Sequence, residues 1–303
     1  MYSVTVFMST YNGEMYLEEQ IKSILKQKKV KVSLWVRDDG SSDNTINILE
    51  KYQRKGKLPY FSGCNLGYGK SFLDLFKNIK IPTDYYAYSD QDDYWEENKL
   101  INAINKLESR TSKVGKIYFS DLCVVDKDLR PVGYKKFDNL IISLGSVLVR
   151  QRVAGCTMVF DNNLFQKANA IEFDNYEYHI SHEWIYILCL ALGGEAIYDK
   201  HAFIKYRRHD YTVTSLGRGV KSRIKREFTQ YKATKWDKSE LCKIILTNYK
   251  KHIPHSNLKL IFLVSNYRFS KLSKLKLLFS RDLNAGNLIF NLKTKLFILT
   301  NVY

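Results

Sequence analysis

Short apolar runs alternate with amphipathic segments through the first 110 residues. The runs 3–8, 32–37 and 85–88 are rich in β-branched and aromatic residues, which is typical of buried strands, and a shorter strand is expected at 60–61. Between these runs, apolar residues recur every three or four positions and predict helices; they are Leu17, Ile21, Ile24 and Leu25, then Ile46, Leu49 and Tyr52, then Phe72, Leu75, Phe76 and Ile79. This alternation predicts an α/β fold in which helices flank a mostly parallel central sheet.

The same pattern continues to about residue 216 and then changes. We expect a strand at 117–120 that continues as a loop at 124–126, an apolar helix at 185–192, and a short strand at 202–204. From Arg218 onward the apolar spacing is helical, with expected helices near 220–231, 241–249 and 258–279. The pattern therefore predicts an α/β region at 1–216 and a helical region at 217–303.

Charge separates the same two regions. Residues 217–303 contain 19 Lys and Arg against 4 Asp and Glu, a net charge of +15, whereas residues 1–216 contain 29 against 27. Basic amphipathic helices suit an anionic membrane surface. The alternative is a helical cap on the first region or on a second subunit in a homodimer, and the two interpretations can coexist. Nucleic acid is disfavoured, because the aromatic residues lie within apolar helical faces.

Cysteine usage and hydropathy point to the cytoplasm. The five cysteines are scattered without any Cys-x-x-Cys spacing, which argues against a disulfide framework or a zinc site. The sequence shows neither a secretory signal pattern nor an apolar run of about 18 residues that could span a membrane. We therefore expect a cytoplasmic protein, peripheral at the inner face of the cell membrane.

Candidate chemistry is concentrated in an acidic loop at 90–93, which follows the strand at 85–89. Asp90 and Asp92 stand one residue apart, where an α/β sheet places its ligands, and could share one hard cation through their oxygens. The pattern after this loop predicts an amphipathic helix that starts near Asp93. The alternative is that Asp92 and Asp93 only cap this helix and complement its dipole.

Two earlier loops also follow strands, at 10–13 and 38–43, so we expect all three loops at one edge of the sheet. A carboxylate such as Asp39 can accept the imide N–H of uracil or thymine, and Lys70 could meet phosphate as a point charge. The alternatives are an Asx-rich turn at 38–43 and a solvated surface lysine. The glycine-rich stretch at 65–70 matches neither a P-loop nor a dinucleotide fingerprint.

In this order, the three loops resemble those of the inverting family 2 glycosyltransferases with the GT-A fold, especially bacterial rhamnosyltransferase-like members. The matching segments are Ser9-Thr10-Tyr11-Asn12-Gly13-Glu14, Arg37-Asp38-Asp39-Gly40-Ser41-Ser42-Asp43 and Ser89-Asp90-Gln91-Asp92-Asp93-x-Trp95. The resemblance implies that Thr10, Tyr11, Asn12 and Asp39 bind the nucleotide base and ribose of a donor. It also implies that Asp90 and Asp92 bind Mg²⁺ or Mn²⁺ on the donor diphosphate.

The resemblance extends to two later segments. Ser181-His182-Glu183-Trp184 lies where the family usually has His-Asp-Trp, which implies that Glu183 is the catalytic base. Lys205-Tyr206-Arg207-Arg208-His209 resembles a Tyr-Arg-x-His element, so His209 would complete the metal shell or contact the diphosphate, and Arg207 or Arg208 would neutralise it. The alternatives are a glutamate that serves only the helix dipole and a solvated basic turn.

The segment 150–160 resembles the acceptor side of these enzymes, although a strand bend at Gly155 would explain it equally. The resemblance implies transfer of a sugar, with rhamnose as one candidate, from a UDP- or dTDP-sugar to a hydroxyl of a lipid-linked bacterial surface polysaccharide, with inversion. A nucleotidyltransferase on a similar sheet, or a non-catalytic nucleotide-sugar-binding or membrane scaffold protein, are the competing interpretations.

Overall fold

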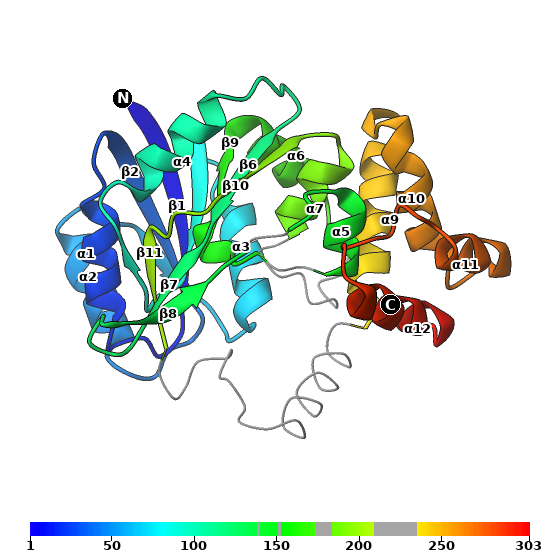
Figure 1. Ribbon diagram of the computed structural model, residues 1–303. Coiled ribbons are helices and arrows are strands. Elements are labelled where there is room, and N and C mark those ends of the chain that lie inside the picture. Colours follow the sequence, from blue (N-terminus) through cyan, green and yellow to red (C-terminus); the bar gives the residue numbers. More distant parts are fainter. Residues whose placement is uncertain (138–139, 151–152, 174–183, 209–234) are drawn as a thin grey trace.

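A central sheet of seven strands organises the molecule (Figure 1). The computed structural model describes residues 1–137, 140–150, 153–173, 184–208 and 235–303. The strand order is β10-β6-β9-β4-β1-β2-β3, and every neighbouring pair is parallel except the two pairs made by β9. The strands are β1 (Tyr2–Thr10), β2 (Val30–Asp38), β3 (Tyr60–Ser62), β4 (Tyr85–Ser89), β6 (Lys116–Ser120), β9 (Val159–Asp161) and β10 (Glu195–Asp199). This largely parallel sheet confirms the predicted α/β class.

Helices cover both faces of this sheet because its strands are apolar on both sides. In β1, Val4, Val6 and Met8 face a core shared with α1 (Leu17–Leu25), α2 (Thr45–Arg54) and α4 (Lys99–Glu108). Phe7 faces the opposite core, which includes α3 (Tyr68–Asn78), α6 (Asn162–Ala170) and α7 (Trp184–Ala191). Full burial of an aliphatic or aromatic side chain is worth about 1.5–3 kcal/mol, so this two-sided burial holds the central strands firmly.

Tyr86 and Tyr88 of β4 are part of an aromatic cluster that packs against α3 and α6. The ring of Tyr86 lies 3.8 Å from that of Phe165 and 5.9 Å from that of Phe7, centroid to centroid, and both pairs are stacked. The Tyr86 hydroxyl donates to the Ile81 carbonyl at 2.9 Å, which satisfies its polar end inside the core. These contacts hold β4, the strand that leads into the acidic loop, in place.

A second, smaller sheet lies beside the acidic loop. Its order is β5-β11-β7-β8, with β5 at Tyr94–Trp95, β11 at Ile204–Arg207, β7 at Leu122–Val125 and β8 at Pro131–Lys135. The expected helix start near Asp93 is wrong: Trp95 is fully buried, pairs with Ile204, and α4 begins only at Lys99. The expected loop at 124–126 is also wrong in part, because Val124 and Val125 belong to β7. The strand expected at 202–204 lies at 204–207.

The tail forms helices, as expected, wherever it is described. These are α9 (Asp237–Tyr249), α10 (His255–Asn266), α11 (Lys271–Leu278) and α12 (Leu288–Leu299), with a 3₁₀ turn, η2, at Lys250–His252. They pack beside α7 and the short helix α5 (Leu144–Val149), on the opposite side of the molecule from α1 and α2 (Figure 1). Tail residues such as Ile261 share one apolar core with the helices on the α3 face of the sheet.

The close contact between α5 and the tail requires a glycine. A Cβ atom on Gly145 would stand 1.6 Å from the carbonyl oxygen of Asp282, so no larger residue fits without backbone movement. The boundary expected near 216 falls within 209–234, outside the described residues. Within the described residues, no helix combines the length and the apolar character needed to cross a bilayer.

Candidate functional site

Gln91 ties the acidic loop to the first loop. Its side-chain oxygen accepts from the Thr10 hydroxyl at 2.6 Å and from the Tyr11 backbone N–H at 2.8 Å, and its amide nitrogen donates to the Tyr11 carbonyl at 3.1 Å. Gly13 allows this approach, because a Cβ there would lie 2.5 Å from the same Gln91 oxygen. The sequence alone assigned Gln91 no role. The carboxyl ends of β1 and β4 thus form one connected surface.

The first and second loops are also joined to each other. Asn12 has a left-handed backbone (φ 47°), which asparagine tolerates better than most residues. Its N–H donates to the Ser41 hydroxyl at 2.9 Å, and its side-chain oxygen accepts from the Ser42 N–H at 2.9 Å. Gly13 N–H donates to the Thr45 hydroxyl at 2.8 Å. Tyr11, by contrast, is 48% exposed, so its ring is available to a flat ligand at this edge.

Within the second loop, Asp38 forms the Asx-type turn that was the alternative interpretation of this segment. Its carboxylate accepts from the backbone N–H groups of Gly40 and Ser41, at 3.1 and 3.0 Å, and from the Ser41 hydroxyl. Gly40 has a φ of +83°, which only glycine adopts at low cost. The loop conformation is therefore set by its own sequence.

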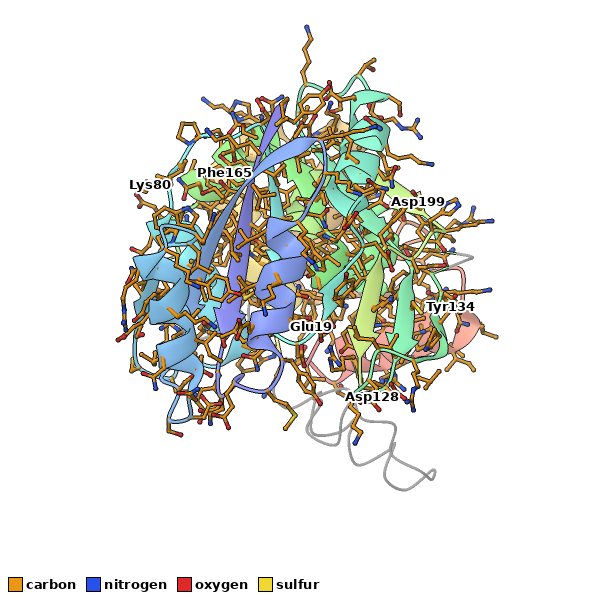
Figure 2. The ribbon with its side chains drawn as sticks, turned by 90° about the vertical axis from the view of Figure 1, so that its left-hand side faces the viewer. Glu19, Lys80, Asp128, Tyr134, Phe165 and Asp199 are labelled. Atoms are coloured by element: carbon orange, nitrogen blue, oxygen red, sulfur yellow. The ribbon has the colours of Figure 1, made fainter. Side chains whose placement is uncertain are left out.

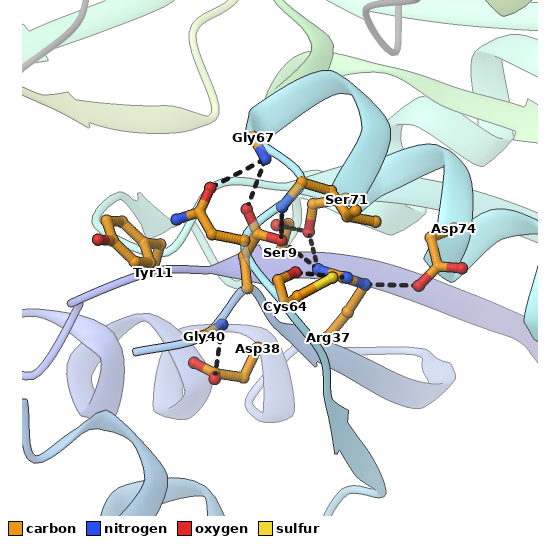
Figure 3. Close-up of polar contacts among 12 residues, drawn as sticks. Ser9, Tyr11, Arg37, Asp38, Gly40, Cys64, Gly67, Ser71 and Asp74 are labelled. Carbon is orange, nitrogen blue, oxygen red and sulfur yellow. Dashed lines mark hydrogen bonds and ion pairs between the residues drawn. The ribbon is translucent and has the colours of Figure 1, made fainter. Parts of the chain in front are cut away.

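Asp39 is buried and binds the loop that precedes α3, between its neighbours Arg37 and Gly67, which Figure 3 labels. Its two oxygens accept from the N–H groups of Leu66 and Gly67 at 2.8 and 2.9 Å, and it forms a buried ion pair with Arg37. The Arg37 guanidinium also donates to Asp74 at 2.6 Å. The expected contact of Asp39 with a base stays a prediction, since the structure shows this carboxylate positioning the segment that leads to half-buried Lys70 at the start of α3.

The acidic loop holds carboxylates close together. Half-buried Asp90 accepts from the Tyr68 hydroxyl at 3.0 Å. Desolvation, and then repulsion by the Asp92 carboxylate, raises the pKa of Asp90 to about 6. Tyr68 reaches this loop from the first turn of α3, so the segment positioned by Asp39 also contacts the acidic group. The sequence alone gave no sign that Tyr68 contacts the acidic loop.

Asp93, the last residue of the acidic loop, does not begin a helix and is fully buried. One of its oxygens accepts from the Arg207 N–H at 3.2 Å, and the other, Oδ2, has no hydrogen-bond partner among the described residues. Burial, followed by repulsion from Asp90 and Asp92, holds the pKa of Asp93 well above its usual range. A buried acceptor without a partner is costly and marks a place where a ligand could bind.

The residues around the Asp93 carboxylate fit a divalent cation. Candidate ligand atoms of Asp90, Asp93 and Cys156 all lie within 4.8 Å of one another. Carboxylate oxygens suit hard cations such as Mg²⁺ and Mn²⁺, whereas burial raises the pKa of the Cys156 thiol and keeps it protonated. The geometry thus groups Asp90 with Asp93, and Asp92 is the neighbouring carboxylate. His209, expected as a third ligand, lies outside the described residues.

Arg207 holds the acidic loop in place. The side chain is 2% exposed, and its guanidinium donates to the Asp92 carbonyl at 3.0 Å, to the Lys127 carbonyl and to the Glu19 carboxylate. Figure 2 shows Glu19 on α1 and Asp128, the neighbour of Lys127, in the turn after β7. The expected contact of Arg207 with a diphosphate is a prediction that this geometry does not favour. Half-buried Arg208, whose buried Nε has no partner among the described residues, fits that role better.

Lys99 is a buried cation close to the acidic cluster. Its Nζ lies 3.3 Å from the centroid of the Trp95 ring and has no hydrogen-bond partner within the described parts of the chain. Burial lowers the pKa of Lys99 to about 7, against the attraction of Cys156 and Asp93. The sequence pattern placed Lys99 within an amphipathic helix, and nothing in that pattern indicated that this lysine is buried.

The catalytic base expected at Glu183 lies outside the described residues, as does its neighbour His182. On the expected acceptor side, Gly155–Thr157 forms a 3₁₀ turn, η1, ahead of β9 and not a bend within a strand, and the acceptor role of this segment stays a prediction. The Thr157 hydroxyl donates to the Ala154 carbonyl at 2.7 Å, which stabilises this turn and fixes Cys156 near the acidic loop.

Comparison with known proteins decides the family. Residues 5–159, about half of the chain and all three loops, match the family described as Glycosyl transferase family 2. The chain belongs to glycosyltransferase family 2. This glycosyltransferase is 31% identical over 261 residues to the dTDP-rhamnosyl transferase RfbG of Shigella flexneri, an alignment that covers 78% of the chain and 83% of that relative. The nucleotidyltransferase interpretation is thereby set aside.

Solved structures show the same fold at low sequence identity. TarS from S. aureus (residues 1–349, in complex with UDP-GlcNAc) superposes with a TM-score of 0.59 and 18% identity, covering 99% of this glycosyltransferase and 82% of TarS. The mannosyltransferase PcManGT from Pyrobaculum calidifontis, in complex with GDP-Man and Mn²⁺, has a TM-score of 0.50 and 17% identity, covering 90% and 71%. The predicted GT-A fold is confirmed, and enzymes of this fold typically use a divalent metal.

Proposed function

We propose that this glycosyltransferase transfers a 6-deoxyhexose such as rhamnose from a nucleoside-diphosphate donor to a hydroxyl of a growing, lipid-linked surface polysaccharide. The observation that carries the proposal is the connection of three strand-end loops into one surface, with an exposed aromatic ring at one end and clustered carboxylates at the other. The similarity to a dTDP-rhamnosyl transferase over most of its length supports the donor class.

The donor nucleotide would lie across the first and second loops. The half-exposed ring of Tyr11 can contact a pyrimidine, and Thr10, Asn12 and Asp39 shape the backbone around it. Lys70 and Arg208 would supply positive charge for the diphosphate. Both are half-buried: Lys70 lies in the first turn of α3, and Arg208 follows Arg207, which contacts the acidic loop. Complexes of the neighbours with UDP-GlcNAc and GDP-Man support a nucleotide-sugar donor.

Asp90 would hold a divalent cation, Mg²⁺ or Mn²⁺, together with Asp93, whose carboxylate lies close to that of Asp90, and with the expected ligands Asp92 and His209. Such a cation, when bound, neutralises charge on the donor diphosphate. Tyr68 and Arg207 keep the acidic loop in place, through the Asp90 carboxylate and the Asp92 carbonyl. Repulsion among these carboxylates is costly in the protein alone, and this supports the assignment.

Glu183 would act as the catalytic base. It would accept the proton of the acceptor hydroxyl while that oxygen attacks the anomeric carbon and the bond to the diphosphate breaks, which inverts the configuration. The proton remains on the glutamate and the electron pair leaves with the diphosphate, so no protein nucleophile is required. Glu183 directly precedes α7 in the sequence, and all eight residues of α7 are buried.

The test is a donor screen with the purified chain. dTDP-rhamnose and a panel of UDP- and dTDP-sugars are incubated with Mg²⁺, Mn²⁺ or EDTA, and release of the nucleoside diphosphate is measured with and without a lipid-linked acceptor. We expect turnover with a deoxysugar donor that EDTA abolishes, and a product of inverted anomeric configuration by NMR. Full turnover by the Glu183→Gln variant would remove this residue from the base role, and no turnover with any donor would favour a non-catalytic scaffold.

A further inference from the structure

Helix α12 exposes its apolar side. Five large apolar side chains, each between 55% and 73% exposed, recur at helical spacing along its outer face; they are Leu288, Ile289, Leu292, Leu296 and Leu299. The inner face buries Thr294 and Ile298, at 4% and 0% exposure. A helix that is apolar on both faces normally lies inside a protein or a membrane. One face of α12 is therefore covered by the protein, and the other is available to a partner.

Helix α11, which neighbours α12, also exposes a row of apolar side chains. Leu272, Leu275 and Phe279 are 60%, 54% and 78% exposed and stand at i, i+3 and i+7, so they share one side of the helix. Helix α11 packs on α12, and the Lys274 ammonium donates to the Leu299 carbonyl at 2.7 Å. We call the eight exposed residues of these two helices the α11–α12 face. Monomeric soluble proteins rarely expose so many large apolar side chains on neighbouring helices.

The charge around this face indicates what covers it. Residues 267–303 contain seven Lys and Arg but a single acid, Asp282. Lys271, Lys276, Arg281 and Lys295 are exposed on the same two helices or between them. A second copy of this segment would bring like charges together with almost no carboxylates to offset them, which costs free energy. An anionic bilayer offers both an apolar interior and negative headgroups.

We propose that the α11–α12 face docks on an anionic lipid bilayer. The leucines, Ile289 and Phe279 enter the boundary between headgroups and acyl chains, while the neighbouring lysines contact lipid phosphates. The helices lie parallel to the membrane surface. This inference goes beyond the composition of the tail, because it assigns the contact to two particular helices. It is independent of the proposed sugar transfer, since lipid binding can be measured without donor or acceptor.

The test is co-sedimentation of the full chain with vesicles of equimolar phosphatidylglycerol and phosphatidylcholine, and with phosphatidylcholine alone. The variant carries Leu292→Ser and Leu296→Ser, both 56% exposed in the native chain. The matched control carries Val132→Ser and Tyr134→Ser on β8, which are 63% and 62% exposed and lie in the smaller sheet. We expect the apparent partition coefficient on anionic vesicles to fall about tenfold or more in the first variant and to stay unchanged in the control.

A second variant, Lys271→Glu with Lys276→Glu, keeps the apolar side chains and should also reduce binding to anionic vesicles. Retention of the wild-type chain in the supernatant at low salt would overturn the proposal. So would equal binding by the Leu292→Ser/Leu296→Ser variant, or equal binding to phosphatidylcholine alone. Sedimentation velocity without lipid provides one more arm: a wild-type dimer that this variant abolishes would assign the face to a second copy and overturn the bilayer assignment.

Discussion

The two halves of the carboxyl edge of the sheet differ in how well their polar groups are satisfied. In the first and second loops, Asn12, Asp38 and Asp39 all have hydrogen-bond partners within the protein. In the acidic half, Asp93 Oδ2, Trp95 Nε1 and Lys99 Nζ are buried without hydrogen-bond partners among the described residues. The half formed by the first and second loops, which we call the base-side half because the nucleotide base is proposed to bind there, is thus preorganised by its own contacts, whereas the acidic half contains buried polar groups without such contacts.

This difference separates two ways of building a binding surface. A loop whose donors and acceptors are already paired loses little entropy when a flat, weakly charged ligand arrives. A cluster of carboxylates in a desolvated place is unfavourable alone, because each raises the pKa of the next. The positive charge of a bound cation would offset the repulsion between these carboxylates. Changes in the two halves should therefore have different signatures in activity, metal dependence and stability.

The largest effect is expected in the acidic half. Replacement of Asp90 by Asn removes a charge that Tyr68 positions and should reduce kcat about 10²- to 10³-fold, the size seen when one charge-stabilising group is removed from an active site. Initial rates at saturating donor, over a titration of Mn²⁺, measure it. The control is Asp128→Asn, an exposed carboxylate in the turn after β7. Unchanged kcat and unchanged metal dependence would show that Asp90 is not part of the metal site.

In the base-side half, the largest effect is expected on folding. Replacement of Arg37 by Met leaves the buried carboxylate of Asp39 without its charge partner and should lower the free energy of unfolding by about 3–5 kcal/mol. Urea unfolding measures it. The control is Arg54→Met, because Arg54 forms an exposed ion pair with Glu50. A loss similar to that of the control would mean that the Arg37–Asp39 pair does not stabilise this half.

Gln91 connects the acidic loop to the first loop, so its replacement should affect donor binding more than the sugar-transfer step. Gln91→Leu removes three hydrogen bonds between the acidic loop and the first loop and should raise the donor KM about tenfold, since one well-made hydrogen bond is worth about 0.5–1.5 kcal/mol. Steady-state kinetics with varied donor separate KM from kcat. A fall in kcat at constant KM would show that the halves are not coupled through this residue.

The smallest effect, a change in thermal stability, is expected for the Asp93→Asn variant in the absence of a divalent metal. The raised pKa of Asp93 means that the folded chain binds this proton more tightly than the unfolded chain, so wild-type stability falls as pH rises above about 4. The variant should unfold at higher temperature at neutral pH in EDTA and should gain less from added Mn²⁺ than the wild type. Thermal unfolding from pH 5 to pH 8 measures both. Identical pH dependence of the two proteins would contradict the inferred charge repulsion.

Local patterns sufficed for much of the fold. The spacing of Leu17, Ile21 and Ile24 predicted α1, and the strands that lead into the three loops also followed from their own composition. Strand β5 was missed because its pairing partner, Ile204, is more than 100 residues away. Helices α5, α6 and α12 and strands β8, β9 and β10 were not identified. In α12, apolar residues on both faces hide the helical period.

The site was predicted in its position but not in its internal contacts. The order of the loops located Thr10, Asp39 and Asp90 at one edge, because parallel strands end together. Burial of Arg207 and Lys99 could not be read from the sequence, since most arginines and lysines lie at the surface and only tertiary contacts turn these two inward. The same holds for Asp93, whose surroundings come from β11 and η1.

Helix α5 has a consequence for how this chain can change over evolutionary time. All six of its residues are buried, Gly145 has no room for a side chain beside Asp282, and the Leu148 carbonyl accepts from both Lys238 and Tyr303. A recombination event that exchanged only the tail would have to reproduce these contacts at once. We therefore expect tails to be inherited together with α5, so that a change in the tail requires matched changes at two distant places in the gene.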